Sequence, residues 1–450
     1  MVAIHKEKTQ PFVVSAPGKV ILFGEHAVVY GKAAIAGSLD MRAYALVAPR
    51  KDNKVRLLLP DVDVDIAFDK STLGRVNISG LGHPAEIETQ VSEVIKVPEG
   101  PGRTAVLAFV YLYGGVFADV QGPRDAAGFT VCVRSLLPVG SGLGSSAALN
   151  VTLSAALLRL CGKIDASIVT AEDKLLVNEW AFRGEQVAHG TPSGIDNSIA
   201  TFGGFLQYTR GQAPINLGSS HALRVLITNT NVPKSTKALV AGVRTLRDSL
   251  PAVIDPILES IHGISLRAAE LFQTNGIADQ GSNDMHIDEL ETQLQEIIRI
   301  NHRLLATLGV SHPALERICE ITSSTGGMAS KLTGAGGGGC ALTLVPHSAA
   351  GSKTESKVVA DLEDDGFQCY CTAVGGSGVC IENGVGAATI EQWIEGMLDQ
   401  HLSLVPSRRR LDRKADAANR APDADEYLGI VSGFSILPSS VIAMLAPNQH

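Results

Sequence analysis

The chain lacks any apolar run long enough to cross a membrane, and its first residues, Met1–Lys8, lack the apolar core of a signal peptide. A transmembrane helix needs about 20 consecutive apolar residues, and a signal peptide needs an apolar segment near its start. The chain also lacks an excess of basic residues, since its formal net charge is -8. Proteins that bind nucleic acids usually carry a basic face. These absences predict a cytoplasmic protein whose partners include no nucleic acid and no membrane.

Cysteine is scarce, with seven in 450 residues, and its number is odd. An odd number cannot pair completely, and dispersal through predicted strands and helices favours reduced thiols in the core. Cys369 and Cys371 are closely spaced. Alternation along their predicted strand puts them on one face with Phe367, and no histidine pair with ligand spacing accompanies them. A zinc site is therefore the less favoured interpretation of this pair.

The remaining composition is that of an ordinary globular chain, with 45% hydrophobic and 19% charged residues. Its length predicts two large domains or three smaller ones. Short apolar runs separated by turn residues predict strands within 12–48 and 53–69, so the first third would be mostly β. A second domain would begin near residue 222, just before a predicted strand at 223–229. The tail 401–450 is arginine-rich near its beginning and is expected to be poorly ordered.

Helical patterns dominate much of the rest. Residues 146–161 are apolar on every face, which predicts a buried helix. The segment from Thr170 resembles a capping box that opens a second helix, ending near Gly190. Long helices are expected through 234–330.

The glycine-rich loop 138–149 is not followed by a lysine. Its glycines stand at three alternate positions, which lets backbone N–H groups turn toward one anion. Ser145 and Ser146 are expected to cap the following helix, whose positive dipole end favours negative charge. A Walker A loop would continue into a lysine, but Ala147 follows, so the chain is not an ordinary P-loop NTPase. We predict a phosphate cradle at 138–149, with a flexible loop before a buried helix as the alternative.

A second glycine cluster, Gly334–Gly339, contains the spacing G-x-G-x-x-G. In a dinucleotide-binding fold this motif follows a strand and opens a helix. Here it leads into the apolar run 340–344, which predicts a strand. The order excludes the dinucleotide-binding interpretation.

Polar groups near the N-terminus suggest the chemistry, because Lys19, Glu25 and His26 interrupt an otherwise apolar, strand-like run. Further polar groups follow: Glu185 lies on a predicted helix, and Asp196 lies about one turn into a short helix that Pro192 would begin. Such charges either pair with one another or face a ligand. Together with the cradle they form the set that phosphoryl transfer to an alcohol requires. Ser146 and Glu185 would hold Mg²⁺, Asp196 would receive the proton of the attacking hydroxyl, and Lys19 would stabilise the alkoxide.

Several motifs together resemble the GHMP small-molecule kinases: Lys19–Tyr30, 138–149, Gly190–Asp196 and Lys331–Gly339. Within that family, Gly24-Glu25-His26 and the residues after it are similar to the members that phosphorylate mevalonate, because galactokinases carry Asp-Tyr shortly after their Gly-Glu-His. The stretch 228–240 is a further similarity. The resemblance covers residues 10–398, and Val139 and Ser141 depart from the residues more often seen in this loop.

The resemblance implies an α/β (α+β) fold of two domains. Residues 10–221 would form an ATP-binding domain of the ribosomal-protein-S5-like type, and residues 222–400 a ferredoxin-like domain, with the site between them. It implies ATP-dependent phosphorylation of the C5 hydroxyl of mevalonate, an early step in making isoprenoid and sterol precursors. It also implies Mg²⁺ as cofactor, mevalonate and MgATP as ligands, a homodimer, and feedback inhibition by isoprenoid diphosphates.

The same resemblance implies roles for single residues. The catalytic residues would be Asp196 and Lys19. The substrate-binding residues would be Lys19, Glu25, His26, Asp196, Thr236 and Ala335. The ATP-binding residues would be Lys19, Pro138, Gly140, Ser141, Gly142, Leu143, Gly144, Ser145 and Ser146. The metal ligands would be Ser146 and Glu185.

Some of these assignments have alternatives. In the alternative interpretation, Glu25 and His26 position Lys19 and the loop and do not contact a substrate. Thr236 would cap the helix that it opens, and Ala335 would matter by being small. For the whole chain, the rival functions are another GHMP kinase, acting on phosphomevalonate or a sugar, and an inert sensor with the same fold.

Overall fold

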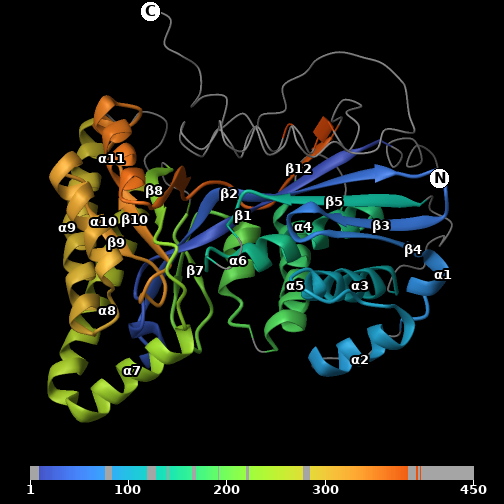
Figure 1. Ribbon diagram of the computed structural model, residues 1–450, viewed down its shortest axis with the longest axis horizontal. Coiled ribbons are helices and arrows are strands. Elements are labelled where there is room, and N and C mark those ends of the chain that lie inside the picture. Colours follow the sequence, from blue (N-terminus) through green and yellow to red (C-terminus); the bar gives the residue numbers. More distant parts are fainter. Residues whose placement is uncertain are drawn as a thin grey trace, which may run out of the picture.

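In the computed structural model the described residues are 10–76, 84–118, 128–138, 141–164, 169–190, 192–218, 222–276 and 284–383, together with 392, 393 and 396. They form an α/β fold in which helices pack against one continuous sheet (Figure 1). The α/β class expected from the sequence is confirmed. The tail 401–450 lies outside the described residues.

The sheet joins the two ends of the described chain. Its strands are β1 (Phe12–Phe23), β2 (Ala34–Pro49), β3 (Lys54–Leu59), β4 (Val64–Asp69), β5 (Phe129–Ser135), β6 (Phe205–Tyr208), β7 (Ile215–Asn216), β8 (Leu223–Asn229), β9 (Ser330–Leu332), β10 (Cys340–Leu344), β11 (Gln368–Val374) and β12 (Cys380–Asn383). The main order is β4-β3-β5-β2-β11-β8-β10-β9, while β1 pairs with β2 and β12, and β6 pairs with β2 and β7. Among these pairs only β3 and β5 are parallel. The long strand β2 therefore connects two parts of the sheet, with β4, β3 and β5 on one side of it and β11, β8, β10 and β9 on the other.

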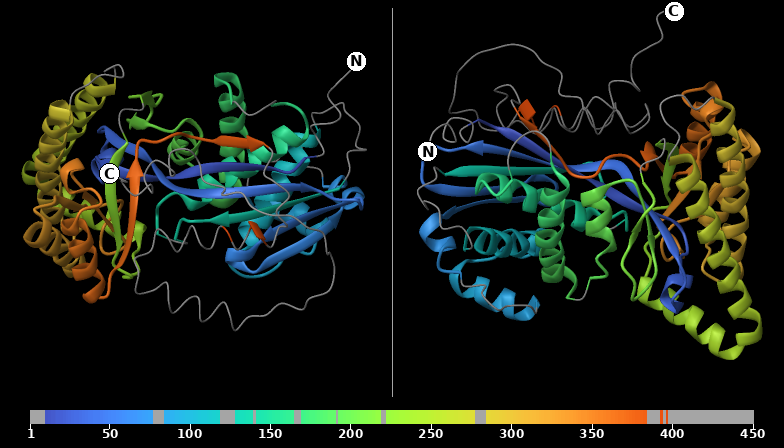
Figure 2. Two further views of the ribbon diagram at one scale, coloured as in Figure 1. Left: turned by 90° about the horizontal axis from the view of Figure 1, so that it is seen from above. Right: turned by 180° about the vertical axis from the view of Figure 1, so that it is seen from behind.

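The helices of the described residues fall into two groups. They are α1 (Lys70–Leu73), α2 (Pro84–Val94), α3 (Arg103–Ala118), α4 (Ser145–Leu160), α5 (Ala171–His189), α6 (Ile195–Phe202), α7 (Thr236–Ser249), α8 (Pro251–Gly276), α9 (Asp284–Thr307), α10 (Pro313–Gly326) and α11 (Lys353–Asp364), with 3-10 turns η2 (Ala27–Tyr30), η3 (Pro60–Val62) and η4 (His347–Ala349). Helices α2, α3 and α5 lie beneath β3, β4 and β5, whereas α8–α10 stand at the other end of the sheet (Figures 1 and 2).

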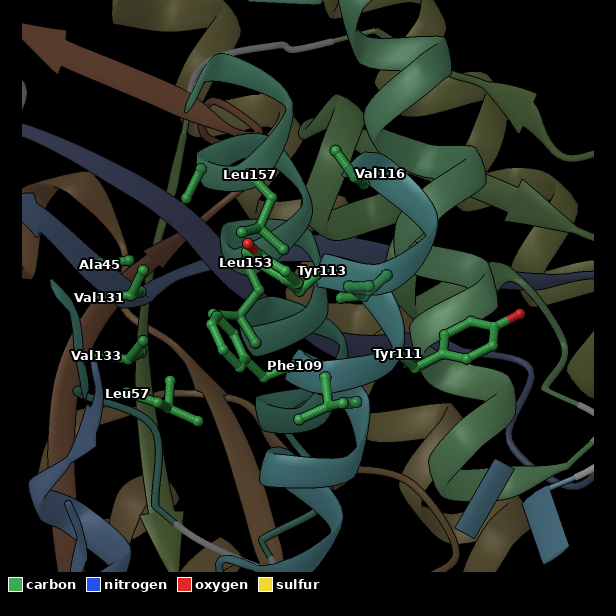
Figure 3. Packing of buried hydrophobic residues seen from close by; sticks show 14 of the residues in the cluster. Ala45, Leu57, Phe109, Tyr111, Tyr113, Val116, Val131, Val133, Leu153 and Leu157 are labelled. Carbon is green, nitrogen blue, oxygen red and sulfur yellow. The ribbon is translucent and has the colours of Figure 1, made fainter. Parts of the chain in front are cut away.

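A hydrophobic core forms where α3 and α4 meet the sheet, as Figure 3 shows. Contributing side chains include Ala45, Leu57, Val131 and Val133 from the strands and Phe109, Val116, Leu153 and Leu157 from the two helices. Burying a Leu or Phe side chain stabilises the fold by about 1.5–3 kcal/mol. Because α4 is apolar on every face, it can lie between the sheet and α5 and carry the loop that precedes it.

Most expected elements are found close to their expected bounds. The buried helix expected at 146–161 is α4, and the helix expected from Thr170 is α5, whose capping box joins the Thr170 and Asp173 side chains to each other's backbone N–H groups. The strands expected at 223–229 and 340–344 are β8 and β10. The expectation that the first third is mostly β is wrong for α2 and α3. In α3 a continuous apolar run forms a buried helix, which such a run does not distinguish from a strand.

The seven cysteines all lie in the described segments and form no disulfide there. Among the helices described, none combines the length and the hydropathy that a bilayer crossing needs.

A buried ion pair fastens the turn after β1 to the far end of the sheet. The Nζ of Lys331 on β9 donates to Glu25 Oε1, and neither side chain is exposed. Lys331 Nζ also donates to the Leu332 carbonyl at 2.7 Å, and Asn301 on α9 donates to Glu25 Oε2 at 3.3 Å. Burial raises the pKa of Glu25 and lowers the pKa of Lys331. Each charge compensates for the desolvation of the other.

Replacing Lys331 with Met should leave the Glu25 charge buried without its partner. We expect the free energy of unfolding to fall by about 3–5 kcal/mol, the usual effect of breaking a buried pair from one side. Urea denaturation followed by circular dichroism measures this. Lys32→Met, which removes the partly exposed partner of the exposed Glu259, is the control and should cost under about 1 kcal/mol. Equal losses in the two variants would contradict the assignment.

Candidate active site

Lys19 is fixed against the glycine-rich loop through its own backbone. It lies on β1, and its N–H donates to the carbonyl of Leu143 at 2.8 Å. Gly144 has a φ of 80°, and a Cβ added there would lie 2.8 Å from Lys19 Cγ. Glycine alone combines this left-handed backbone with so close an approach. The loop therefore places Lys19 beside the first turn of α4.

Helix α4 begins differently from the expectation. Its N-cap is Gly144, and no side chain caps the helix, so the prediction that Ser145 and Ser146 cap it is wrong. Both serines belong to the first turn instead. The first N–H groups of a helix have no partner within the helix, and its dipole is positive at this end. The start of α4 therefore favours an anion.

The rest of the predicted cradle is only partly described. The Pro138 carbonyl accepts a hydrogen bond from Ser141 Oγ at 2.8 Å. Gly142 has a φ of 80°, a backbone conformation that favours glycine. Gly140 lies outside the described residues.

Ser146 and Glu185 are brought together by the packing of α4 against α5. Ser146 Oγ donates to Glu185 Oε1 at 2.8 Å and lies 3.1 Å from Oε2. One turn further along α5, His189 Nε2 lies 3.2 Å from the same hydroxyl oxygen. Burial raises the pKa of Glu185, and the charge of Asp196 adds to the rise. A cation at this point would relieve both effects.

The oxygens of Ser146 and Glu185 suit a magnesium ion. An octahedral Mg²⁺ with oxygen ligands at about 2.0–2.1 Å has neighbouring ligands about 2.9 Å apart. The two observed separations, 2.8 and 3.1 Å, bracket that value. Within the described residues no group of three or more His, Cys, Asp or Glu could hold a metal. An ion here would take its remaining ligands from an anionic substrate and from water.

Asp196 lies in the first turn of α6 and faces Lys19. The expected helix start at Pro192 is wrong, because Gly194, with a φ of 81°, is the N-cap. Asp196 Oδ1 lies 3.2 Å from Lys19 Nζ, and the two side chains are 37% and 13% exposed. The carboxylate therefore has a cationic partner and is still accessible to a ligand.

Glu25 and His26 turn inward from the end of β1. The Glu25 carboxylate is engaged by Lys331, as described above. His26 Nε2 donates to the carbonyl of Ala335 at 2.9 Å, and burial lowers the pKa of the imidazole. This geometry favours the positioning role for both residues, with the Ala335 backbone as a partner. Their direct contact with a substrate stays a prediction.

Thr236 opens α7 and is exposed to solvent. Its alternative role as a helix cap is wrong, because Ser235 is the N-cap and its Oγ accepts from the N–H of Ala238 at 3.3 Å. The Thr236 hydroxyl is thus not committed to capping.

Lys234 is a candidate that the sequence patterns did not single out. A Cβ on Gly142 would lie 3.8 Å from its Nζ, and a Cβ on Gly339 would overlap its side chain. Burial lowers the pKa of the ammonium group, and the charge of Lys19 lowers it further. Lys234 lies within the stretch 228–240 that resembles the family, which marks it as a candidate, but the sequence does not show where its side chain points. Two lysines thus approach the glycine-rich loop from different elements.

The structure brings several of the predicted site residues together, and their side chains determine which chemistry the site can support. Lys19 joins Asp196 to the loop, and Ser146 joins the loop to Glu185. An anion at the start of α4 would meet backbone N–H groups, two lysines and a potential cation site. A hydroxyl group near Asp196 would meet a proton acceptor. This combination suits transfer of an anionic group to an alcohol.

Two family descriptions match the chain. Residues 107–204 match "GHMP kinases N terminal domain", and residues 287–364 match "GHMP kinases C terminal". The two segments lie on either side of the domain boundary expected near residue 222.

Curated relatives and solved structures match most of the chain. It is 40% identical over 409 residues to a mevalonate kinase from Homo sapiens, covering 87% of this chain and 99% of the relative. It is 38% identical over 408 residues to a mevalonate kinase from Bos taurus, with the same coverage, 87% and 99%. A solved structure, L. major mevalonate kinase in complex with R-mevalonate, matches with a TM-score of 0.58 and 25% identity, covering 81% of this chain and 96% of the other.

Replacing Gly144 with Ala should destabilise the protein through both the backbone and the contact with Lys19. A left-handed backbone costs a non-glycine residue about 1–2 kcal/mol, and an overpacked contact adds about 1–3 kcal/mol. Gly31→Ala is a matched control, because Gly31 has a φ of 76° with nothing within 4 Å of the added Cβ. Urea denaturation of both variants should give the larger loss for Gly144→Ala. A loss no larger than the control's would refute the close approach.

Proposed function

The chain belongs to the GHMP kinases, and within them to the mevalonate kinases, so we propose that its site transfers the γ-phosphoryl group of ATP to the C5 hydroxyl of mevalonate. The products are 5-phosphomevalonate and ADP, at an early step of isoprenoid and sterol precursor synthesis. The observation that carries this proposal is the 40% identity to a mevalonate kinase over 99% of that relative. The Lys19–Asp196 pair beside the start of α4 supports it.

Asp196 and Lys19 would act on the attacking hydroxyl. A new bond forms between the C5 oxygen and the γ-phosphorus, while the bond from that phosphorus to the bridging oxygen of ADP breaks. The hydroxyl proton passes to the Asp196 carboxylate, and Lys19 stabilises the negative charge on the C5 oxygen. Asp196 acts in this way either as a full general base or as an electrostatic anchor that takes the proton late.

The ATP phosphates would lie against the glycine-rich loop and the start of α4. Backbone N–H groups there supply the donors, and the 16-residue helix supplies a favourable dipole. Lys19 and Lys234 add positive charge from β1 and from the segment before α7. The dissociative transition state of phosphoryl transfer is stabilised mostly by such positioning and charge.

Ser146 and Glu185 would hold the Mg²⁺ of MgATP. When bound, Mg²⁺ neutralises charge on the phosphate oxygens and orients them. The spacing of the two protein oxygens and the burial of Glu185 support this assignment. Through that ion, the same residues would hold the phosphates next to the start of α4.

Further parts of the proposal concern regulation and assembly. Isoprenoid diphosphates carry the same chemical group as ATP and would compete for the same loop. A homodimer is consistent with exposed apolar side chains on α8 and α9, such as Val253, Leu266 and Ile300. The division into domains at 222 and the cytoplasmic location, both expected from the sequence, belong to the same proposal.

Coupled ADP-release kinetics with MgATP test the function. Turnover should require mevalonate and be at background level with phosphomevalonate, galactose and homoserine. In Asp196→Asn, kcat should fall by at least about a hundredfold, because general acid–base groups contribute roughly 10²–10⁴-fold. The dissociation constant for ATP should change less than threefold.

Activity confined to phosphomevalonate or a sugar would overturn the substrate assignment. Unchanged turnover in Asp196→Asn would overturn the role of that residue. Absence of turnover with every alcohol, despite ATP binding, would favour the inert sensor.

Replacing Lys234 with Met should weaken ATP binding. The KM for ATP should rise about tenfold or more, since a hydrogen bond to a charged group contributes about 1.5–3 kcal/mol. Lys237→Met is the control, because Lys237 is exposed on the first turn of α7. Steady-state kinetics at saturating mevalonate measures both. An equal KM in the two variants would contradict the role.

A further inference from the structure

Asn150 lies one turn after Ser146 on α4 and contacts the same carboxylate. Its Nδ2 donates to Glu185 Oε1 at 2.6 Å. Both residues are almost completely buried, with 2% exposure for Asn150 and 3% for Glu185. A short hydrogen bond to a buried carboxylate is strong, because water does not compete for either group.

The surroundings of Asn150 give its side chain little freedom. A Cβ added at Gly184 on α5 would lie 2.5 Å from Asn150 Oδ1 and 2.9 Å from its Cγ. The absence of a side chain at Gly184 is therefore what lets the amide reach Glu185. Asn150 Oδ1 has no hydrogen-bond partner among the described residues. A buried acceptor without a hydrogen bond costs free energy. The fold retains the Asn150 amide despite that cost.

The contacts of Glu185 are distributed unequally between its two oxygens. Oε1 receives the Asn150 amide at 2.6 Å and the Ser146 hydroxyl at 2.8 Å. Oε2 receives no contact from Asn150, and its neighbours are Ser146 Oγ at 3.1 Å and His189 Nε2 at 3.8 Å. The amide therefore fixes the rotation of the carboxylate and leaves Oε2 to other partners.

We propose that Asn150 is a positioning residue that orients Glu185 for metal binding, and that Gly184 provides the space for it. The inference rests on the proposed function, because it takes Glu185 and Ser146 as the ligands of Mg²⁺. Asn150 has no direct contact with the ion in this arrangement. It acts through the hydrogen bond that holds a ligand in place, and the loss of such a bond commonly costs 10–100-fold in metal affinity.

A purely structural role makes different predictions. Asn150 lies between α4 and α5, so its loss would then lower stability without a specific effect on the metal. Gly184→Ala would likewise lower stability, because the added Cβ would lie 2.5 Å from Asn150 Oδ1 and overpack this contact. Metal affinity, and not stability alone, therefore separates the two roles.

The test measures Mn²⁺ binding to the folded enzyme with ADP by electron paramagnetic resonance, with thermal unfolding as the check on folding. The variants are Asn150→Ala, Gly184→Ala and the double variant. Each single variant should raise the Mn²⁺ dissociation constant about tenfold. The double variant should also show about a tenfold increase, not a hundredfold one, because both changes remove the same hydrogen bond.

Thr152→Val is the matched control. Thr152 is fully buried on the same helix, and its Oγ1 donates to the Ala148 carbonyl at 2.7 Å without contacting Glu185. It should leave Mn²⁺ affinity unchanged even where it lowers the melting temperature. Should Asn150→Ala fail to fold, Gly184→Ala still tests the proposal, because it displaces the amide and keeps the residue.

Glu185→Gln separates this inference from the function on which it rests. Weaker Mn²⁺ binding in Glu185→Gln, with unchanged binding in Asn150→Ala and Gly184→Ala, overturns the positioning role alone. Unchanged binding in Glu185→Gln overturns the metal assignment itself. Multiplying effects in the double variant also overturn the proposal, since the two residues would then act separately.

Discussion

The buried pair of Glu25 and Lys331 constrains the rest of the site. It joins the end of β1 to β9, and a second link runs from Thr333 Oγ1 to the Ile21 carbonyl at 2.8 Å. These contacts hold the end of β1 and the turn that follows it, and Lys19 lies on that strand. The position of Lys19 relative to the glycine-rich loop thus depends on residues more than 300 positions away in the sequence.

The sequence identified the candidate catalytic and metal-binding residues better than it identified the residues that pair with them. Lys19 stood out because charge is unusual in an apolar strand, and Glu185 and Asp196 because they complete the set of groups that phosphoryl transfer requires. The structure brings each of them to a neighbour from another element. Their roles in catalysis and binding stay predictions. Lys331 was recognised as part of the Lys331–Gly339 motif but not as a partner of Glu25, and Asn150 was not recognised at all. The meaning of a buried polar residue depends on what the fold places opposite it.

Local structure was predicted where a specific residue determines it. The capping box at Thr170 and the stretch of α4 followed from side-chain chemistry and from an apolar pattern on every face. The starts of α4 and α6 were missed for one reason. In both, a glycine with positive φ is the N-cap, whereas the sequence rules favour a serine at the N-cap and a proline at the first helical position. Those rules describe helices that satisfy their own ends, whereas these two ends face a charged site.

The continuous strand β2 has a consequence for how such a protein can change over evolution. It pairs with β5 through Ala43–Pro49 and with β11 at Leu39, so both parts of the sheet share its register. An insertion of one residue between Leu39 and Ala43 would turn the side chains on one side of it to the opposite face, so the two parts could not both keep their registers. A change of register in one part of the sheet is therefore passed on to the other part through β2.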